Sequence, residues 1–524
     1  MTSRERKLGL LLVLMAALCA IVYIESPPSF TTPVDPRAPK HYVVSDALAD
    51  EFKKIRAAET NDDLEERCLA TPDLAEFSWD PKLVKAMCRL LSRKMISWKE
   101  LNDALDRRDA AFLQQTFDGY LETSFKHGHH GFIDWTYANM FNNASKEELE
   151  MTTRWIELDP DSAYALAARG THYVQAAYEA RGTAYARDTP SENFDRMREC
   201  IVKARSDFDA ALERNPKLIT VYVQLLRIAQ LTGDEDLRYR SVTKALAIDP
   251  ADHFVYDYWI DAAEPRWGGS LAEMERAGRL AAEHAKANPI LGRMQGRATC
   301  DRALQATCTN CSVPPDNAKA LKLFRESAAH GATRCFLLGA AWSAAATDDL
   351  QDAVRYYTQA VRFLNDGDSR VRRAGILYTL GEREWAMQDL DVLLKGYPNY
   401  IEALNEKAYL VDLENHPVEA ETLYLRTLAV DPNNERAGLE LSRLYLSELP
   451  NFDKAAPLVA GLLERNPKLA RAWLYKAALA RGNEAACREA LQNYLKYVDR
   501  NNAYEKNDIA GAQARLNQLN AKRA

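Results

Sequence analysis

Four cysteines lie within one stretch of 36 residues and are the side chains best placed for covalent or metal chemistry. Two of them form the C-x-x-C sequence Cys308-Thr309-Asn310-Cys311, a spacing used by redox and zinc sites. A thioredoxin-like redox role needs a βαβ setting, and structural zinc needs four converging ligands. The surrounding sequence is helical in pattern and the spacing to Cys300 and Cys335 is irregular. We therefore expect structural disulfides among these four cysteines, with zinc or redox chemistry as the alternative.

The histidine cluster Lys126-His127-Gly128-His129-His130-Gly131 is the second candidate for metal chemistry. Closely spaced imidazoles can bind a transition metal if a loop brings them together. The cluster contains no Cys, Asp or Glu, and its two glycines are typical of a hairpin turn. We expect a solvated loop at His127–His130, and a metal site there is the alternative.

Motifs for the common enzyme classes are missing from the chain. The sequence contains no phosphate-binding loop, nucleophile elbow, zinc-protease helix or kinase motif. Its net charge is −7 with an isoelectric point near 5.9, and no lysine- or arginine-rich stripe is present. Nucleic-acid binding requires clustered cations that displace counterions. We expect no enzymatic activity, no cofactor and no nucleic-acid partner.

Three arginines and a tryptophan are the candidates for contact with a partner molecule. Arg169 and Arg181 are each followed by glycine, as at helix C-termini, where a cation also complements the helix dipole. Arg266 and Trp267 belong to the string PRWGGS, whose glycines could bring backbone N–H groups together around a carboxylate. The alternative is structural: ion-paired arginines, and a turn in which Trp267 packs into the core and Ser270 caps the next helix.

Prolines at a regular period place these residues in a helical framework. Runs of helical pattern end in Asn-Pro, Asp-Pro or Tyr-Pro about every 34 residues, at Pro216, Pro250, Pro398, Pro432 and Pro467. This period, with proline at the end, is typical of tetratricopeptide helix-turn-helix units, which stack into solenoids. Residues 316–342 resemble the related Sel1-like repeat. We predict an all-α, right-handed α-α superhelix and no β-sheet, with Pro160 in the first turn of a helix and a polar insertion at 184–199.

The N-terminal residues predict a membrane segment. Arg4, Arg6 and Lys7 precede an apolar run from Leu8 to Ile24, near the lower length limit for a membrane-spanning helix. Leu18 stands where a signal-peptide cleavage site needs a small residue. We expect an uncleaved, single-pass signal anchor with the C-terminal region exported, and a cleaved signal peptide is the alternative.

Several segments resemble a bacterial tetratricopeptide-like domain of unknown function, catalogued under the number 4034, over roughly residues 90–290. The residues that carry the resemblance are Trp155, Asp159-Pro160-x-Ser162-x-x-Ala165, Arg169-Gly170, Arg181-Gly182 and Pro265-Arg266-Trp267-Gly268-Gly269-Ser270. The resemblance implies a helical repeat fold and a bacterial source, and it implies no known activity.

Together these patterns divide the chain into consecutive parts. They are the cytoplasmic N-terminus 1–7, the signal anchor 8–24, a proline-rich linker 25–44, helical hairpins 45–150, the family core 151–290, a cysteine-containing Sel1-like segment 291–345 and C-terminal tetratricopeptide repeats 346–524. We expect a non-catalytic, membrane-anchored interaction scaffold of the bacterial inner membrane, with its repeats in the periplasm and a protein or peptide held in a concave groove. An envelope enzyme or metal or redox protein that uses Cys300–Cys335 or His127–His130 is the alternative.

Overall fold

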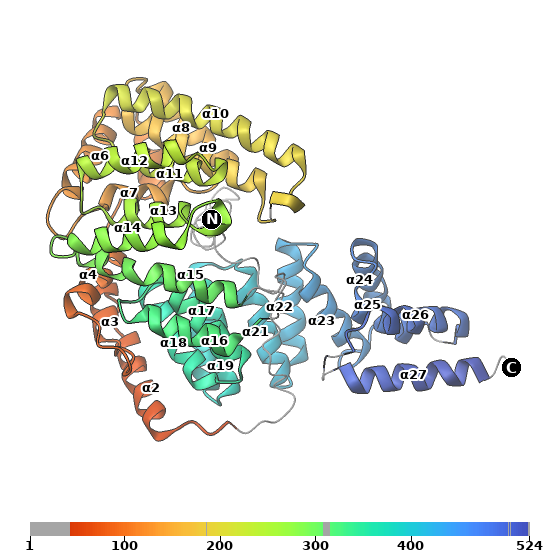
Figure 1. Ribbon diagram of the computed structural model, residues 1–524. Coiled ribbons are helices and arrows are strands. Elements are labelled where there is room, and N and C mark those ends of the chain that lie inside the picture. The colour runs from red at the N-terminus through yellow and green to blue at the C-terminus, as the bar shows by residue number, and fades with distance from the viewer. Residues whose placement is uncertain are drawn as a thin grey trace. The chain divides into compact units, whose positions relative to one another are not determined.

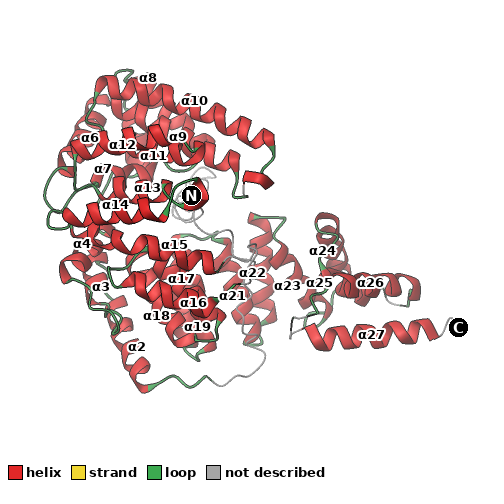
Figure 2. Cartoon of the chain, in the orientation of Figure 1, coloured by secondary structure: helices red, strands yellow, loops and turns green. Residues whose placement is uncertain are grey.

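The protein is described by a computed structural model over residues 42–184, 186–307, 315–480, 482–500, 502 and 505–521. Every regular element in these ranges is a helix, as the sequence predicts (Figures 1 and 2). No helix within the described ranges is long and apolar enough to cross a bilayer. The predicted signal anchor, residues 8–24, lies outside the described residues, as does almost all of the predicted linker.

The chain forms two compact units, Val44–Ser369 and Arg370–Ala524. The α-helices of the first unit are α2 Asp46–Glu59, α3 Leu64–Ala70, α4 Pro81–Leu91, α5 Trp98–Asp106, α6 Ala110–Ser124, α7 Phe132–Met140, α8 Lys146–Leu158, α9 Ala163–Arg181, α10 Ser191–Arg214, α11 Ile219–Thr232, α12 Glu235–Ile248, α13 His253–Ala262, α14 Leu271–Glu283, α15 Arg297–Ala306, α16 Asn317–Ala328, α17 Arg334–Ala346 and α18 Leu350–Leu364. Short 3₁₀ helices are η1 Ala186–Asp188, η2 Pro265–Trp267 and η3 Pro289–Gly296.

Helix α19, Gly367–Thr379, crosses the boundary between the units. The second unit continues with α20 Arg383–Gly396, α21 Ile401–Leu413, α22 Pro417–Val430, α23 Glu435–Leu446, α24 Phe452–Arg465, α25 Ala470–Leu479, α26 Glu484–Tyr497 and α27 Lys506–Ala521.

The spacing of the helices reproduces the proline period. Helices α11 and α13 begin at Ile219 and His253, and α21, α23 and α25 begin at Ile401, Glu435 and Ala470. Each of these helices pairs with the helix that follows it, and α11, α21 and α23 also contact the first helix of the next hairpin. An isolated hairpin leaves one apolar side exposed, and stacking on a neighbour buries it. The prediction of all-α, serially stacked hairpins is therefore confirmed for the described residues.

Local sequence signals explain where the helices begin and end. Ser97 and Glu100 form a reciprocal capping box at the start of α5, in which each side chain satisfies the other residue's backbone N–H. Gly233 ends α11 in the left-handed conformation that glycine adopts without strain. Pro417 occupies the first turn of α22, where no backbone N–H is needed.

The structure places two helix starts that the sequence left open or misplaced. The polar insertion predicted at 184–199 contains the start of α10, which begins at Ser191 and continues for 24 residues. The helix expected to start at Pro160 begins instead at Ala163, because the Ser162 hydroxyl accepts a hydrogen bond from Ala165 N and makes Ser162 the N-cap.

Aromatic side chains fill the core of the first unit. Phe117 on α6 is fully buried, with its ring centroid 4.9 Å from that of Trp155, 5.6 Å from Tyr164 and 6.0 Å from Tyr137. These rings come from α8, α9 and α7, so a single phenylalanine joins the N-terminal hairpins to the first stacked hairpin. Offset and edge-on aromatic pairs of this kind add to the free energy gained from burial.

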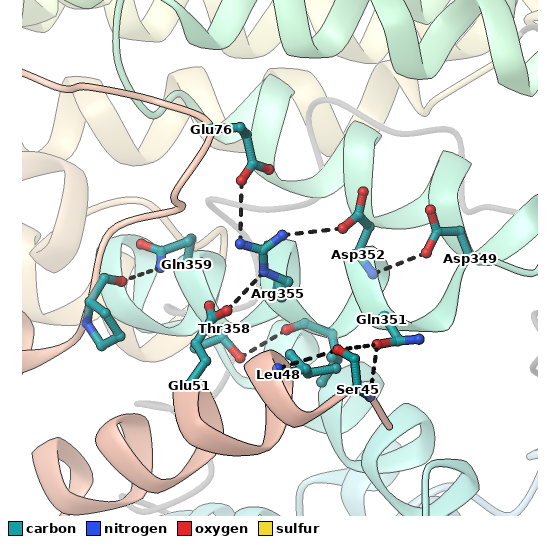
Figure 3. A network of polar contacts seen from close by, with 12 residues as sticks. Ser45, Leu48, Glu51, Glu76, Asp349, Gln351, Asp352, Arg355, Thr358 and Gln359 are labelled. Carbon is teal, nitrogen blue, oxygen red and sulfur yellow. Dashed lines mark hydrogen bonds and ion pairs between the residues drawn. The ribbon is translucent and has the colours of Figure 1, made fainter. Parts of the chain in front are cut away.

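The N-terminal helices α2–α4 pack against α18, which lies almost 300 residues later in the chain (Figure 3). Arg355 of α18 contacts Glu51 at 3.0 Å, Glu76 at 3.3 Å and Asp352 at 3.3 Å. Arg362, about two turns further along α18, donates from Nε to the carbonyl of Cys68 at 2.7 Å. The N-terminal helices are thus an integral part of the first unit.

Ion pairs between successive first helices of the hairpins stabilise the second unit. Arg436 of α23 lies 2.8 Å from Glu406 of α21. About two turns further along the same two helices, Arg443 pairs with Asp412. Arg471 of α25 reaches Asp508 of α27 at 2.6 Å. Networks of this type hold neighbouring repeats in register, although each exposed pair contributes little alone.

Candidate functional site

Arg169, the first predicted binding residue, is engaged within the fold. Its Nε and Nη2 donate to the two carboxylate oxygens of Asp207, each at 2.8 Å, and so join α9 to α10. Asp207 is buried, and this bidentate pair is the main reason that the pKa of Arg169 is raised. Because Nε and Nη2 of Arg169 are both bound to Asp207, few of its donors remain for binding a partner molecule.

The other three predicted residues lie together at the C-terminal end of α9. The Cζ atom of Arg181 is 4.9 Å from the ring centroid of Trp267, and that of Arg266 is 5.5 Å from the same centroid. Arg181 is only 8% exposed, and its Nη1 donates to the carbonyls of Gly182 and Ala184 at 2.9 and 3.0 Å. Arg181 and Trp267 therefore serve mainly as packing in this region.

Arg266 is more exposed and is paired with an acid of the same turn. Its Nε donates to Oε2 of Glu264 at 2.8 Å. Burial is the main cause that raises the pKa of Glu264 to about 7, while the Arg266 charge opposes that rise.

The PRWGGS segment forms a turn whose amides are used within the turn. Trp267 N and Gly269 N both donate to the Glu264 carbonyl, at 2.9 and 3.2 Å, and Gly268 N donates to the Pro265 carbonyl at 3.1 Å. A Cβ on Gly269 would overlap the carbonyl of Ala263, which explains the glycine at this position. The suggested amide nest for a carboxylate is thus not formed. Ser270 caps α14 by accepting from Glu273 N at 3.2 Å.

The cysteines form two disulfides among the described residues. Cys300 of α15 is bonded to Cys335 of α17, with an S–S distance of 2.09 Å, and Cys68 of α3 is bonded to Cys88 of α4 at 2.08 Å. Cys308 and Cys311 lie outside the described residues. Because a disulfide sulfur cannot act as a thiolate ligand, the four-cysteine zinc alternative lacks two of its donors.

The histidine loop, predicted to be solvated, packs on the turn that precedes α13. His130 Nδ1 lies 2.8 Å from Oδ2 of Asp249, and the side chains are 12% and 4% exposed. Gly128 and Gly131 both have φ of +77°, and a Cβ on Gly131 would come within 2.9 Å of the His253 ring. Among the residues with a described placement, no group of three or more His, Cys, Asp or Glu could hold a metal ion. The loop is therefore docked by one imidazole, while His127 remains exposed.

The second unit contains a pocket of about 560 Å³ between α23, α25, α26 and α27, here called the C-terminal pocket. It is lined by Arg443, Leu446, Ser447, Leu474, Tyr475, Ala477, Ala478, Gly482, Asn483, Glu484, Cys487, Leu491, Gly511, Ala512, Arg515 and Leu519. Leu491, Ala512 and Leu519 are at most 4% exposed and form its floor, whereas Ala478 and Arg515 are exposed. Ligand pockets commonly have this size and a mostly apolar lining.

Two arginines of the C-terminal pocket differ in their electrostatic surroundings. Arg443 is 15% exposed and pairs with three carboxylates, those of Asp412, Glu440 and Glu448. Arg515 forms no ion pair with any residue of the described ranges, and its Nη1 donates to the amide oxygen of Gln518 at 3.3 Å. The pocket thus combines an apolar floor with one cation that is free to pair with a bound group.

Sequence patterns did not predict the C-terminal pocket, whose lining comes from four helices. Among the described side chains of α25, only Ala472 is fully buried, whereas all residues of α11 from Ile219 to Leu231 are buried. The signal available in the sequence is the apolar residues of α25 at helical spacing, such as Leu474 and Ala477, which the structure leaves only partly buried.

No family model matches the chain. Its resemblance to the bacterial domain catalogued as 4034 therefore stays a prediction. Among solved structures, the chain is similar to yeast Tom70 with 12% identity and a TM-score of 0.37, over 80% of this chain and 95% of that one. It is also similar to the APC/C hetero-tetramer Cut9–Hcn1 (14% identity, TM-score 0.35, 90% and 96% covered). A third similar structure is the IFIT1 monomeric mutant with Gppp-AAAA (12%, 0.33, 86% and 100%). Similarity at this level carries no inference about ligands.

Proposed function

We propose that the protein is a non-catalytic helical-repeat module that binds a segment of a partner protein in the C-terminal pocket. The supporting observation is the contrast between α11 of the first unit and α25 of the second unit. Helix α11 is buried on every side, and its Arg227 donates to Asn142 at 2.9 Å and to Gln175 at 2.9 Å. Its arginine and glutamine side chains thus hydrogen-bond to residues of the chain itself. In the second unit, Leu474 and Tyr475 of α25 remain partly exposed at the pocket.

The chemistry of the pocket suggests what the partner presents. The floor residues Leu491, Ala512 and Leu519 are suited to an apolar side chain, and the cation of Arg515 favours a carboxylate close to it. Full burial of one leucine-sized side chain contributes about 1.5–3 kcal/mol. Millimolar affinity already needs about 4 kcal/mol after the entropic penalty of association. The partner segment must therefore also contact residues beyond the pocket, and Tyr475 is the nearest aromatic side chain at its rim.

We further propose that residues 8–24 anchor the protein in a bacterial inner membrane, with the repeats on the oxidising, periplasmic side. The two disulfides support this proposal, because such bonds persist in exported proteins and are rare in reducing compartments. A reporter that is active on only one side of the membrane, fused after Ala524, tests the orientation. Activity on the cytoplasmic side would contradict the proposal.

The binding proposal is tested by site-specific photocrosslinking. A photoreactive phenylalanine analogue at Tyr475 should capture a defined partner from envelope extract, and the same analogue at Val418, which is 63% exposed on α22, should not. The Ala478→Trp variant fills the pocket from an exposed position, so it should abolish the crosslink without changing thermal unfolding. Ala514→Trp, on the exposed side of α27 and outside the pocket lining, is the matched control. A crosslink that survives Ala478→Trp would exclude the pocket as the binding site.

A further inference from the structure

Two arginines converge on the histidine loop of the first unit. Arg93 Nη2 donates to the carbonyl of Gly128 at 3.2 Å. Arg89, from the last turn of α4, approaches the same glycine, because a Cβ built there would lie 4.0 Å from Arg89 Nη1. The loop turns tightly at this point, with His129 N donating to the carbonyl of Lys126 at 2.9 Å. Both guanidinium groups therefore lie beside a turn that itself carries Lys126 and His129.

The cations at this turn are poorly compensated. Arg89 meets Glu65 of α3 at 3.6 Å without a hydrogen bond, and Glu65 also accepts from the Ser92 hydroxyl at 3.1 Å. The Nε and Nη1 atoms of Arg93 are buried and have no hydrogen-bond partner among the described residues. In contrast to Arg169, which has a bidentate carboxylate, neither arginine has a well-placed counter-ion.

Electrostatics at the turn confirm that the positive charges repel one another. The pKa of His129 is lowered first by burial and then by Arg93, Arg89, Lys126 and His130. Burial is the main cause that lowers the pKa of Arg93 to about 10, and the charge of Arg89 contributes to this fall while Asp252 opposes it.

Apart from Glu65, the acids near the turn face the protein interior. Asp249 is bound to His130, and Asp252, whose charge opposes the fall in the pKa of Arg93, is fully buried. The other titratable groups in this neighbourhood, His253 and Arg293, are basic and cannot neutralise the arginines. A bound anion would therefore be the natural counter-ion on the outer side of the turn.

We propose that Arg89, Arg93, Lys126 and His129 form a binding site for a phosphate group. Guanidinium forks match tetrahedral oxyanions, and charge-assisted hydrogen bonds to them are about twice as strong as neutral ones. The site is open to solvent, since Lys126 is exposed, His129 is partly exposed and the Arg89 side chain is 41% exposed. It lies in the first unit and does not depend on the C-terminal pocket.

Protonation of His129 and phosphate binding should be linked, because an anion favours the charged imidazole. The full chain in a non-ionic, phosphate-free detergent is titrated with inorganic phosphate at constant ionic strength, and the imidazole of His129 is followed by NMR. Saturating phosphate should raise the pKa of His129 by about one unit. His129→Gln assigns the signal.

Variants decide whether the named residues hold the anion. Arg89→Gln and Lys126→Gln should each weaken phosphate binding about tenfold or more, as expected for the loss of a charge-assisted contact. Arg205→Gln, an exposed arginine on α10, should leave binding unchanged. Thermal unfolding checks that the variants fold. Unchanged binding in Arg89→Gln and Lys126→Gln, or a pKa of His129 that does not respond to phosphate, would overturn the proposal.

A second anion distinguishes the source of the phosphate. Dimethyl phosphate carries the single charge of a phospholipid diester, whereas inorganic phosphate approaches two charges near neutral pH. Equal binding of both would assign the site to a lipid-type diester, and preference for inorganic phosphate would assign it to a free phosphate or monoester. Binding of neither would refute the site.

Discussion

Replacing Asp134 with asparagine should stabilise the protein at neutral pH, although it removes a buried charged group. Asp134 lies in the first turn of α7, is 2% exposed, and has no hydrogen-bond partner for either carboxylate oxygen among the described residues. Asp252, the N-cap of α13, is fully buried nearby. Burial is the main cause that raises the pKa of Asp134 to about 6, and the charge of Asp134 helps to raise the pKa of Asp252.

The sign and size of the effect follow from linkage. A carboxyl group whose pKa is higher in the folded state stabilises the fold below its unfolded pKa, here 3.8, and that contribution is lost as pH rises through about 6. The shift of about two units corresponds to about 3 kcal/mol. The asparagine introduced by Asp134→Asn cannot ionise, so the variant escapes this loss and also relieves Asp252 of a neighbouring charge.

Urea unfolding at pH 4.5 and pH 7.5 measures the difference. We expect Asp134→Asn to gain about 3 kcal/mol relative to the natural protein at pH 7.5 and only about 1 kcal/mol at pH 4.5, which lies just above the unfolded pKa. The buried histidines His172 and His253 titrate in both proteins, so their effects cancel in the comparison. Asp209→Asn, at an exposed position of α10, should show no such pH dependence. Equal destabilisation by Asp134→Asn at both pH values would refute the reasoning.

Three further changes test the packing of the first unit. Phe117→Ala should lower the free energy of unfolding by about 3–5 kcal/mol in a urea titration, because it leaves a cavity among three aromatic rings. Arg362→Met should cost roughly 2–4 kcal/mol by removing hydrogen bonds to the Cys68 carbonyl and to Asp73, and hydrogen exchange should accelerate in α2–α4 before the rest of the unit. Gly269→Ala should lower the melting temperature, since its Cβ overlaps the Ala263 carbonyl, whereas Gly119→Ala, with no atom within 4 Å, should raise it slightly.

The fold could be predicted largely because its signals are local. A hairpin repeat states its period in residues that are close in sequence, so Pro216 and Pro250 marked the interval at which α11 and α13 begin. The right-handed sense of the superhelix stays a prediction. The polar composition of segment 184–199 gave no indication that α10 begins within it, because a long helix with a polar outer face has a similar composition.

Contacts over long sequence separations could not be predicted in the same way. Nothing in the residues around Cys68 indicates that the Cys68 carbonyl accepts a hydrogen bond from Arg362, because every residue carries such a carbonyl and the two positions are 294 residues apart. The same holds for His130 and Asp249, which are 119 residues apart. The partner of a buried arginine can be identified only when the tertiary fold is known.

The candidate sites show the same division. Proximity in sequence was enough to place Arg266 beside Trp267, and the structure adds Arg181 to them. Proximity in sequence does not reveal whether such a cluster faces solvent. In the structure Arg181 is almost fully buried. The C-terminal pocket needs residues from four helices, between Arg443 and Leu519, so no single sequence window contains it.

The need of buried polar groups for partners, and of apolar side chains for cover, explains the difference between α11 in the first unit and α25 in the second unit. Helix α11 carries Thr220, Gln224, Arg227 and Gln230 at helical spacing, a polar row that an isolated stack would present to water. Once the chain covers this row, each buried polar group needs a partner, and Arg227 obtains three amide oxygens from Asn142, Gln175 and Gln224. Around the C-terminal pocket, Leu474 and Ala477 of α25 pack on apolar residues of α26 and α27 but stay partly exposed. We therefore expect a partner to gain free energy by covering the partly exposed apolar side chains of α25, as proposed for the C-terminal pocket.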